Sequence, residues 1–353
     1  MSLKYLTLTM AAVSAFDTIS VTENGQQKTM YVVGPNWYPG TEGGKVKINH
    51  GGRSYLATQN QEGPMDYYAP NLRGGVLEFT VDLSQAKCGC NHALYLVRMP
   101  GKNQDGTVRP SEGNDYYCDA NRVGGDYCPE FDVMEANTYA WQSTPHKCNA
   151  PSGKGWYDWC DGSGKCWQKA HDQGTYGPGK QLDTTKPFTS KTTFDASNYF
   201  TTELSQNGFK ITMNSECGDY YPGIAGDLEA GMTIAISNWG GQGIDMSWLD
   251  GSTGCQEQCD NNGNLFISDI KITTGGSGPH PPPTPGHYDF GDKCDHPNDG
   301  KCGNNCSADN CRWSWPSNDP AKWASKDADC RCKGQVMESS SVSEIESETF
   351  FLQ

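Results

Sequence analysis

Short apolar segments separated by glycine, asparagine and aspartate recur from about residue 16 to residue 274, and they limit the folds open to this chain. None of them carries a long helical period, and β-branched and aromatic residues recur within them. The clearest examples are residues 75–82, 93–98, 231–237 and 264–273. Many strands without helices of comparable length predict an all-β fold. We expect a two-sheet antiparallel sandwich whose concave face could hold an extended ligand.

The composition supports this prediction and narrows the class of partner. The chain has 353 residues, enough for one large domain and a small one, and it contains 42 glycines, 17 tyrosines and 10 tryptophans. Its formal net charge is −15. An acidic chain is a poor partner for nucleic acid and for anionic membranes, whereas neutral substrates meet no electrostatic barrier.

The first fifteen residues resemble a secretory signal. Lys4 supplies a basic end, residues 6–12 are apolar, and residues 13–15 form an Ala-x-Ala-like cleavage site. An ordinary first strand is the alternative. Sixteen cysteines favour secretion, since an even, high count is typical of an oxidising compartment. No later apolar run is long enough to span a membrane, so we expect a soluble extracellular protein.

The composition changes after the predicted sandwich domain, residues 16–274. Residues 275–286 are rich in glycine and proline and predict a semi-rigid linker. Residues 287–334 hold six cysteines and predict a small disulfide-rich domain, whose pairing the sequence leaves open. A zinc site is the alternative. Three tryptophans in this unit suggest a carbohydrate-binding module, and residues 335–353 form a Ser- and Glu-rich tail that we expect to be disordered.

One stretch of the sandwich domain, residues 126–137, concentrates carboxylates. Glu130, Asp132 and Glu135 lie within six residues and alternate with apolar side chains, which predicts a strand with acids on one face. Glu135 would fall on the opposite face of a regular strand. A one-residue bulge near residues 133–134 would return it to the acidic face. An exposed edge strand studded with acids is the alternative interpretation.

Three acids on one sheet face cost repulsion and desolvation, so the arrangement suggests chemistry. Hydrolysis of a glycosidic bond needs two carboxyl groups: one protonates the leaving oxygen while the other attacks or activates water. A third acid between them can hydrogen-bond the nucleophile and separate the pKa values of the pair.

The residues around these acids resemble glycoside hydrolase family 7, the cellobiohydrolases and endoglucanases of cellulose breakdown. Cys128-Pro-Glu-Phe-Asp-Val-Met-Glu-Ala-Asn137 is similar to that family's Cys-x-Glu-Met-Asp-Ile-Trp-Glu-Ala-Asn. Thr144-Pro-His-Lys-Cys148, Cys88-Gly-Cys-Asn-His-Ala-Leu-Tyr95 and Met246-Ser-Trp-Leu-Asp250 match further motifs in the family's order. The resemblance runs from about residue 73 to residue 273 and implies a concanavalin-like jelly roll with a concave cleft.

The resemblance also implies roles, residue by residue. Glu130 matches the nucleophile, Glu135 the general acid/base and Asp132 the carboxyl that supports the nucleophile. The remaining matches are to residues that bind substrate, and each has core packing or a local backbone bond as its alternative role: His146, Trp239, Trp248, Asn91 and Tyr95. No cofactor or metal is implied, and we expect a monomer that binds cellulose or another β-glucan.

Several departures from the family pattern refine this expectation. The connection between Asp119 and Tyr127 is short where the family carries a long insertion, which favours an open cleft and internal cleavage. Residues 16–73 match the family poorly. Two alternatives stay open: a non-catalytic sugar-binding protein on the same sandwich, and a laminarinase-like β-1,3(4)-glucanase of the same clan. The Glu-x-Asp-x-x-Glu spacing favours family 7 over the latter, whose common motif is one residue shorter.

Overall fold

The computed structural model describes residues 16–276 with short gaps, together with the backbone of two strands near the C-terminus. The gaps are residues 36–39, 62, 64–65, 112–114, 197–198, 219, 242, 252, 256–257 and 261. The predicted signal and the acidic tail lie outside the described residues, as does most of the linker. Of the small domain, the structure describes only strands β18 (Cys311–Ser314) and β19 (Asp329–Cys332), which pair antiparallel.

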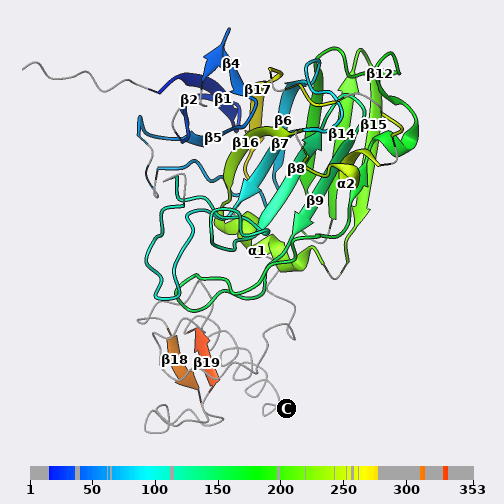
Figure 1. Cartoon of the computed structure of the whole chain (residues 1–353). Coiled ribbons are helices and arrows are strands. Elements are labelled where there is room, and N and C mark those ends of the chain that lie inside the picture. Colours follow the sequence, from blue (N-terminus) through cyan, green and yellow to red (C-terminus); the bar gives the residue numbers. More distant parts are fainter. Residues whose placement is uncertain are drawn as a thin grey trace, which may run out of the picture. The chain divides into compact units, whose positions relative to one another are not determined.

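The remaining described elements are mostly strands, as the sequence predicts (Figure 1). They are β1 (Thr18–Glu23), β2 (Gln26–Val33), β3 (Thr41–Glu42), β4 (Lys45–Asn49), β5 (Gly52–Ala57), β6 (Val76–Asp82), β7 (Cys90–Val97), β8 (Glu130–Ala136), β9 (Trp141–His146), β10 (Gln168–Lys169), β11 (Tyr176–Gly177), β12 (Leu182–Asp183), β13 (Phe188–Phe194), β14 (Tyr199–Gln206), β15 (Phe209–Glu216), β16 (Thr233–Gly240) and β17 (Asn264–Thr273).

Most of these strands form one continuous hydrogen-bonded sheet. Its order is β10-β9-β8-β7-β16-β5-β2-β1-β17-β6-β13-β14-β15, with β4 attached to β17 and β3 to β4. Neighbours in this path pair antiparallel except β1 and β17, which pair parallel. Two of the hairpins turn on Asn-Gly, at residues 24–25 and 207–208, with positive φ at both positions. Asn-Gly is the dipeptide that favours the tight turns matching strand twist.

The sheet folds over on itself, so that its two ends face each other as the layers of a sandwich (Figure 1). Phe131 of β8 shows this most directly. Its ring centroid lies 5.2 Å from that of Phe194 on β13 and 4.9 Å from that of Phe200 on β14, both edge to face. These aromatic rings belong to a large apolar cluster that both layers share. The predicted sandwich is therefore confirmed.

The two ends of the sheet differ in how they are covered. We call β5, β16, β7, β8 and β9 the site half, and β17, β6, β13, β14 and β15 the outer half. Strands of the outer half alternate between buried and more exposed side chains. Strands of the site half are buried on nearly every position. Their second face meets another apolar cluster, which includes Tyr55, Tyr95 and Tyr117.

Two helices accompany the strands in the described part of the chain: α1 (Pro222–Ala230) and α2 (Ser247–Asp250), besides the 3₁₀ turn η1 (His171–Gln173). The sequence analysis expected no helix as long as the strands, and the nine-residue α1 corrects it. Its proline at the start and Gly231 after its end, at φ 92°, are typical helix boundaries. None of the helices in the described residues has the length and hydrophobicity to span a bilayer.

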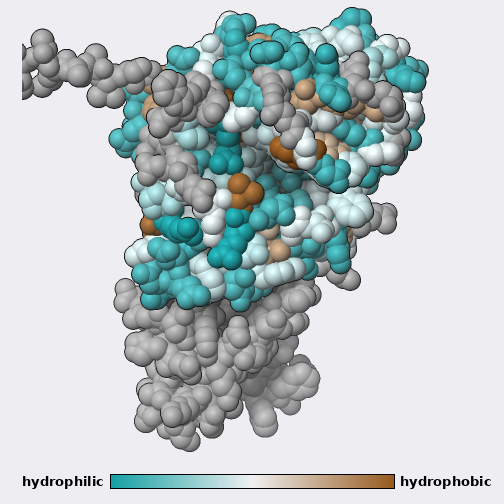
Figure 2. Space-filling view, viewed as in Figure 1, coloured by the Kyte–Doolittle hydropathy of each residue, from teal (hydrophilic) through white to brown (hydrophobic). Residues whose placement is uncertain are grey.

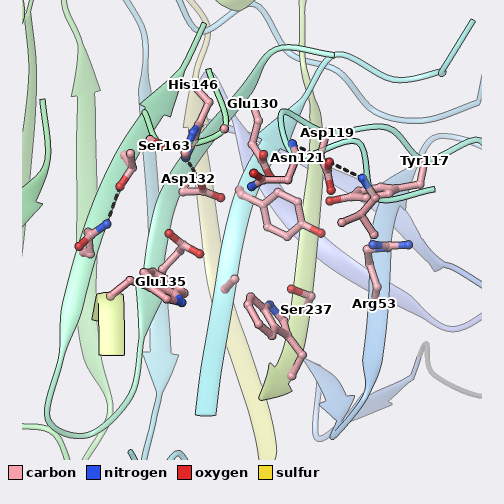
Figure 3. A pocket seen from close by; sticks show the side chains of 18 of the residues that line it. Arg53, Tyr117, Asp119, Asn121, Glu130, Asp132, Glu135, His146, Ser163 and Ser237 are labelled. Atoms are coloured by element: carbon pink, nitrogen blue, oxygen red, sulfur yellow. Dashed lines mark hydrogen bonds and ion pairs between the residues drawn. The ribbon is translucent and has the colours of Figure 1, made fainter. Parts of the chain in front are cut away.

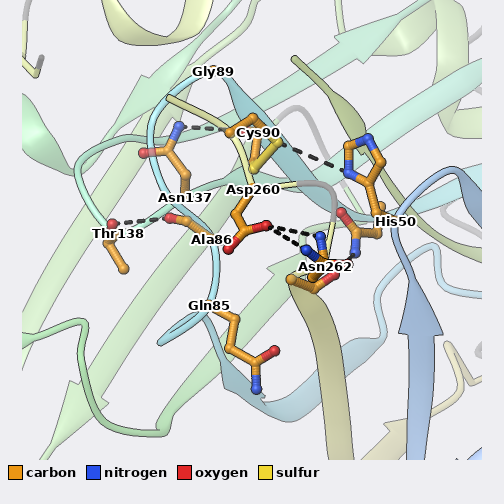
Figure 4. Close-up of a disulfide and its surroundings, with 12 residues drawn as sticks. His50, Gln85, Ala86, Gly89, Cys90, Asn137, Thr138, Asp260 and Asn262 are labelled. Atoms are coloured by element: carbon orange, nitrogen blue, oxygen red, sulfur yellow. Dashed lines mark hydrogen bonds between the residues drawn. A yellow bond between two sulfur atoms is a disulfide. The ribbon is translucent and has the colours of Figure 1, made fainter. Parts of the chain in front are cut away.

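Five disulfides brace the described part of the chain. They join Cys88 to Cys255, Cys90 to Cys259, Cys118 to Cys128, Cys148 to Cys160 and Cys166 to Cys217. The Cys90–Cys259 bond ties the start of β7 to the segment that precedes β17 (Figure 4). Beside it, the Asn137 side chain at the end of β8 donates to the Cys90 carbonyl over 3.1 Å.

Candidate active site

The carboxylate strand β8 contains the bulge that its spacing predicts. Against β7, Met134 pairs with Leu94 and Asp132 with Tyr95, so Val133 is the extra residue. The pairing of β8 with β9 shifts between the same positions, Asp132 and Glu135. The bulge places Glu135 on the side of the strand that carries Glu130 and Asp132, and Figure 3 shows all three carboxyl groups projecting into one space. The prediction from the spacing is confirmed.

These acids are withdrawn from solvent. Glu130 and Asp132 are 7% and 6% exposed, and Glu135 is partly buried. Glu130 accepts a hydrogen bond of 3.1 Å from the backbone N–H of Ala120. The Ser143 hydroxyl donates to the backbone carbonyl of Asp132 and fixes β8 against β9.

Burial and mutual repulsion both act on the protonation of these carboxyl groups. Burial raises the pKa of Glu130 well above its usual value, and the charges of Asp132 and Asp119 raise it further. Burial and then Asp119 raise the pKa of Asp132 in the same way. For Glu135, burial and then Asp132 raise the pKa, while the bond from Asn91 opposes the shift. Raised pKa values favour the protonated forms of these carboxyl groups, which suits groups that exchange protons with a substrate.

His146 lies at the end of β9 and is paired with the central acid. Its Nε2 is 2.9 Å from Asp132 Oδ2, and its Nδ1 donates to the backbone carbonyl of Asp161 over 2.9 Å. The ring is only 6% exposed, so both nitrogens face protein groups. The prediction that His146 belongs to the site agrees with this geometry. Its immediate partner is Asp132, because β8 and β9 are neighbours.

Asn91 holds Glu135 from the neighbouring strand β7. Its side-chain amide donates to Glu135 Oε1 over 2.8 Å, and its side-chain oxygen accepts the Ala136 backbone N–H over 3.2 Å. The residue is fully buried. The sequence analysis placed Asn91 in the lining of the cleft, whereas these contacts give it the task of orienting an acid.

The acids line a cavity of about 1030 Å³ on the site half. Its walls comprise Pro35, Gly51, Gly52, Arg53, Ala93, Tyr95, Tyr117, Asp119, Asn121, Val123, Glu130, Asp132, Glu135, Gln142, Thr144, His146, Gly162, Ser163, Trp167, Lys169, Ser237, Trp239 and Trp248. The surface in Figure 2 is mainly hydrophilic, and its hydrophobic residues occur in small separate groups. A cavity lined by both carboxyl groups and aromatic rings suits a ligand that has both hydroxyl groups and apolar faces.

Aromatic side chains stand on both sides of the acids. Trp239 and Trp248 stack with ring centroids 6.4 Å apart, and 39% of Trp248 is exposed. Trp167, just before β10, is 54% exposed on the other side. The sheet order is β10-β9-β8-β7-β16, so β8 lies midway between the two groups. A ligand that contacts both groups must cross the acids.

Comparison with known proteins relates this chain to one family and to several glucanases. Residues 40–124 match the model of glycosyl hydrolase family 7. The chain is 32% identical over 289 residues to endoglucanase EG-1 of Hypocrea jecorina, in an alignment that covers 70% of this chain and 59% of that protein. Endo-beta-1,4-glucanase celB of Emericella nidulans is 31% identical, with 56% of this chain and 62% of that protein covered. The chain is therefore similar to glycosyl hydrolase family 7 over residues 40–124 and to these endoglucanases over more than half of its length.

Two solved structures share the fold of this chain. A Humicola insolens endocellulase EGI superimposes with a TM-score of 0.54 at 24% identity, covering 68% of this chain and 78% of that one. An endoglucanase I complexed with cellobiose gives a TM-score of 0.59 at 21% identity, covering 75% and 98%. The chain thus spans 59% of the length of endoglucanase EG-1, and it covers 98% of the solved endoglucanase I chain.

The family match corrects one expectation about its extent. The matched range starts at residue 40, inside the segment 16–73 that the sequence analysis compared poorly with family 7. Arg53 of β5 comes from that segment and lines the cavity. Its guanidinium carbon lies 3.4 Å from the centroid of the Tyr117 ring, and it pairs with the buried Asp115. Sequence reasoning missed this cation because no local motif surrounds it.

Asp119 is another residue of the site that the sequence analysis did not assign. It lines the cavity, is 4% exposed, and accepts the backbone N–H groups of Asn121 and Val123 through Oδ1. Burial raises the pKa of Asp119, although these bonds oppose the shift. A signal was available, because Tyr117-Cys-Asp-Ala120 also resembles a stretch of family 7.

The aromatic predictions agree with the lining of the cavity. Trp239, Trp248 and Tyr95 all line it. Tyr95 is 4% exposed, and burial is the main cause that raises the pKa of its phenol to about 12. Its ring lies edge to face with Tyr117 at 6.5 Å. Tyr95 therefore contributes both to the wall and to the cluster beneath it.

Proposed function

We propose that this chain is a retaining glycoside hydrolase that cleaves β-1,4-glucosidic bonds inside cellulose or a related β-glucan chain. One observation carries the proposal: a bulged strand aims three buried carboxyl groups into a cavity with tryptophans on both sides. Its family 7 relatives include an endoglucanase and an endo-beta-1,4-glucanase. Two carboxyl groups facing one bond are the minimum for a double displacement.

The roles follow the order of the acids in the family motif. Glu130 is the nucleophile, and the Ala120 N–H favours its charged form. Glu135 is the general acid and then the general base, and burial raises its pKa, which favours the protonated form that the acid step needs. Asp132, between them along β8, supports Glu130. In a retaining enzyme the two outer carboxyl groups stand about 5–5.5 Å apart.

The same geometry supports a mode of substrate binding. A glucan laid across the strands would meet Trp167 on one side of the acids and the Trp239–Trp248 pair on the other. The flat faces of glucosyl rings present C–H groups that stack on indole rings. Arg53, Asn121 and Gln142 in the walls offer hydrogen-bond donors to hydroxyl groups.

The short connection between Asp119 and Tyr127 supports internal cleavage. The Cys118–Cys128 disulfide closes this connection, and a β-bridge pairs Asp119 with Tyr127. A segment held down in this way is too short to roof a tunnel. An enzyme with an open cleft lowers the viscosity of a soluble cellulose derivative after few cuts.

The test compares soluble cellulose, mixed-linkage glucan and β-1,3-glucan as substrates, with viscosity and reducing ends followed together. We expect cleavage of the first two with a rapid loss of viscosity, and an α/β product analysis that shows retention. Preference for β-1,3-glucan would favour the laminarinase-like alternative. Binding of glucan without cleavage would favour the sugar-binding protein.

We also propose that the protein acts outside the cell as a monomer, with residues 287–334 as a tethered carbohydrate-binding module. Five disulfides support an oxidising compartment. Tethering raises the effective concentration of substrate at the cleft. Gly275 donates to the Asn71 carbonyl over 2.9 Å, so a truncation should end after Gly276. The truncated protein should keep its activity on soluble oligosaccharide and lose binding to insoluble glucan. Unchanged binding would contradict the proposal that residues 287–334 are a carbohydrate-binding module.

A further inference from the structure

Protein groups face both ring nitrogens of His146, and the Asp161 carbonyl decides which tautomer the ring adopts. The Asp161 carbonyl, 2.9 Å from Nδ1, can only accept a hydrogen bond, so Nδ1 must carry a proton. Nε2 then faces Asp132 Oδ2 at 2.9 Å. Either Nε2 or the carboxyl must carry a proton for this contact to be a bond. The contact between His146 and Asp132 therefore holds one proton, which sits either on Nε2 or on the carboxyl group.

The Asp161 carbonyl is itself fixed by the Asp161 side chain. Oδ1 accepts the backbone N–H groups of Ser163 at 3.3 Å and Gly164 at 3.2 Å, and Oδ2 accepts the Tyr220 hydroxyl at 3.0 Å. The backbone N–H of Asp161 donates to the Lys147 carbonyl over 2.9 Å. A carboxylate that closes its own turn in this way sets the direction of its carbonyl.

Tyr220 joins the same turn to the strand that carries His146. Its hydroxyl oxygen accepts the Lys147 N–H over 3.2 Å while it donates to Asp161. The ring is 6% exposed, and the ammonium groups of Lys147 and Lys165 lie 4.8 and 5.8 Å from its centroid.

The turn also packs directly on the imidazole. A Cβ added at Gly164 would lie 2.4 Å from Thr144 Cγ2 and 2.9 Å from His146 Cε1, so only glycine fits there. The backbone at Gly164 has φ 61°, which also favours glycine. The turn therefore packs closely against the Cε1 edge of the His146 ring.

We propose that Asp161, anchored by Tyr220, is a positioning residue that holds His146 in the Nδ1–H form and so keeps a proton in the pair with Asp132. That proton reduces the negative charge beside Glu130. The proposed nucleophile needs this reduction so that it can itself be ionised. The expected effect on hydrolysis rests on the proposed function. The tautomer of His146 does not, and it can be measured without substrate.

The first test is spectroscopic and needs no substrate. Nitrogen NMR of ¹⁵N-histidine-labelled protein reports the tautomer of each ring, and the His146→Asn variant identifies the His146 signals by their loss. We expect a protonated Nδ1 in the wild type and a mixture of tautomers in Asp161→Ala. Asp183→Ala is the matched control, because Asp183 closes a turn through Gly179 and Thr185 on a different loop. An unchanged His146 spectrum in Asp161→Ala would overturn the proposal.

The second test is a double-mutant cycle on hydrolysis. Asp161→Ala should lower kcat about tenfold with KM nearly unchanged, and Tyr220→Phe should lower it less. In a His146→Asn background, Asp161→Ala should have no further effect, because its only route to the acids is lost. An equal tenfold loss in both backgrounds would show a purely structural role and reject the proposal. A wild type without glucanase activity would reject the proposed function and leave the NMR result to decide this one.

Discussion

The site half and the outer half of the sheet use similar strands in opposite ways. In the outer half, β6 and β13 bury one face and leave the other near solvent, as antiparallel sheets commonly do. In the site half, β7 and β9 are buried on every residue. The second face there carries the acids of the cavity together with the apolar cluster of Tyr55, Tyr95 and Tyr117. Full burial of polar side chains costs free energy, and it is tolerated where they are hydrogen-bonded and serve a reaction.

The largest expected contrast between the halves is in activity. Glu130→Gln and Glu135→Gln should each lower turnover by on the order of 10²–10⁴-fold, since each removes a group that bonds to or protonates the substrate. The matched change in the outer half is Glu203→Gln, which breaks an exposed ion pair with Lys210. It should leave turnover unchanged. Initial rates on a soluble oligosaccharide measure all three, and an active Glu130→Gln would remove Glu130 from the mechanism.

The next contrast is in stability, at the contact between the halves. Phe131→Ala should lower the free energy of unfolding by about 3–5 kcal/mol, because its fully buried ring meets two phenylalanines of the other layer. Tyr199→Ala in the outer half, where 49% of the side chain is exposed, should cost well under half of that. Chemical denaturation monitored by fluorescence compares them. Equal losses would mean that the two layers do not share one core.

The halves also differ in how far the sequence predicts them. Alternation along residues 75–82 and 264–273 predicts strands of the outer half because one face meets water. The bulge in β8 was equally predictable, from the spacing of three acids and the burial that a shared face implies. These features are local in sequence, so a short window contains the evidence.

The remaining features of the site arise from contacts distant in sequence. Arg53 reaches Asp115 and Tyr117 from a strand sixty residues away, and Trp167 enters the cavity only because β10 pairs with β9. The turn at Asp161 depends on Tyr220 in the same way. Such residues have no local pattern, because their roles depend on the order of strands in the sheet. The same holds for the disulfides, whose partners include residues 88 and 255.

A smaller expected effect concerns pH and stability. Burial raises the folded-state pKa of Glu130 and Asp132 above the unfolded values of about 4, so the folded protein binds more protons above that pH. Stability therefore falls as pH rises through the raised pKa values. Glu130→Gln should therefore raise the free energy of unfolding at pH 7, because it removes a carboxyl group whose burial favours the protonated form. At pH 4 the gain should vanish.

The control for this effect has the opposite sign. The Lys186 ion pair, with hydrogen bonds from Thr185 and Gly179, lowers the pKa of Asp183 below its usual range. Its charged form therefore favours the folded state, and that contribution is lost as pH falls through the lowered pKa. Asp183→Asn should give no gain at pH 7. Melting temperatures at pH 4 and pH 7 separate the two cases, and a Glu130→Gln variant less stable at pH 7 would contradict the argument.

The smallest effect distinguishes aromatic residues that bind sugar from those that are merely exposed. Trp239→Ala and Trp167→Ala should each weaken the binding of a cello-oligosaccharide to the Glu130→Gln protein by about 0.5–1.5 kcal/mol, the range of one aromatic contact. Using an inactive background measures binding without turnover. Tyr199→Ala is the control, since its side chain is as exposed as that of Trp167 but lies in the outer half.

Ligand length sharpens this last test. Trp239 lies on β16 and Trp167 just before β10, on opposite sides of β8, so a short oligosaccharide cannot contact both. Each substitution should therefore weaken long oligosaccharides, while a disaccharide should respond to one of them at most. Calorimetric titration with a series of lengths measures this directly. If neither substitution affects any length while Tyr199→Ala does, the glucan would not cross the site half, and the proposed path of the substrate over Glu130 and Glu135 would be wrong.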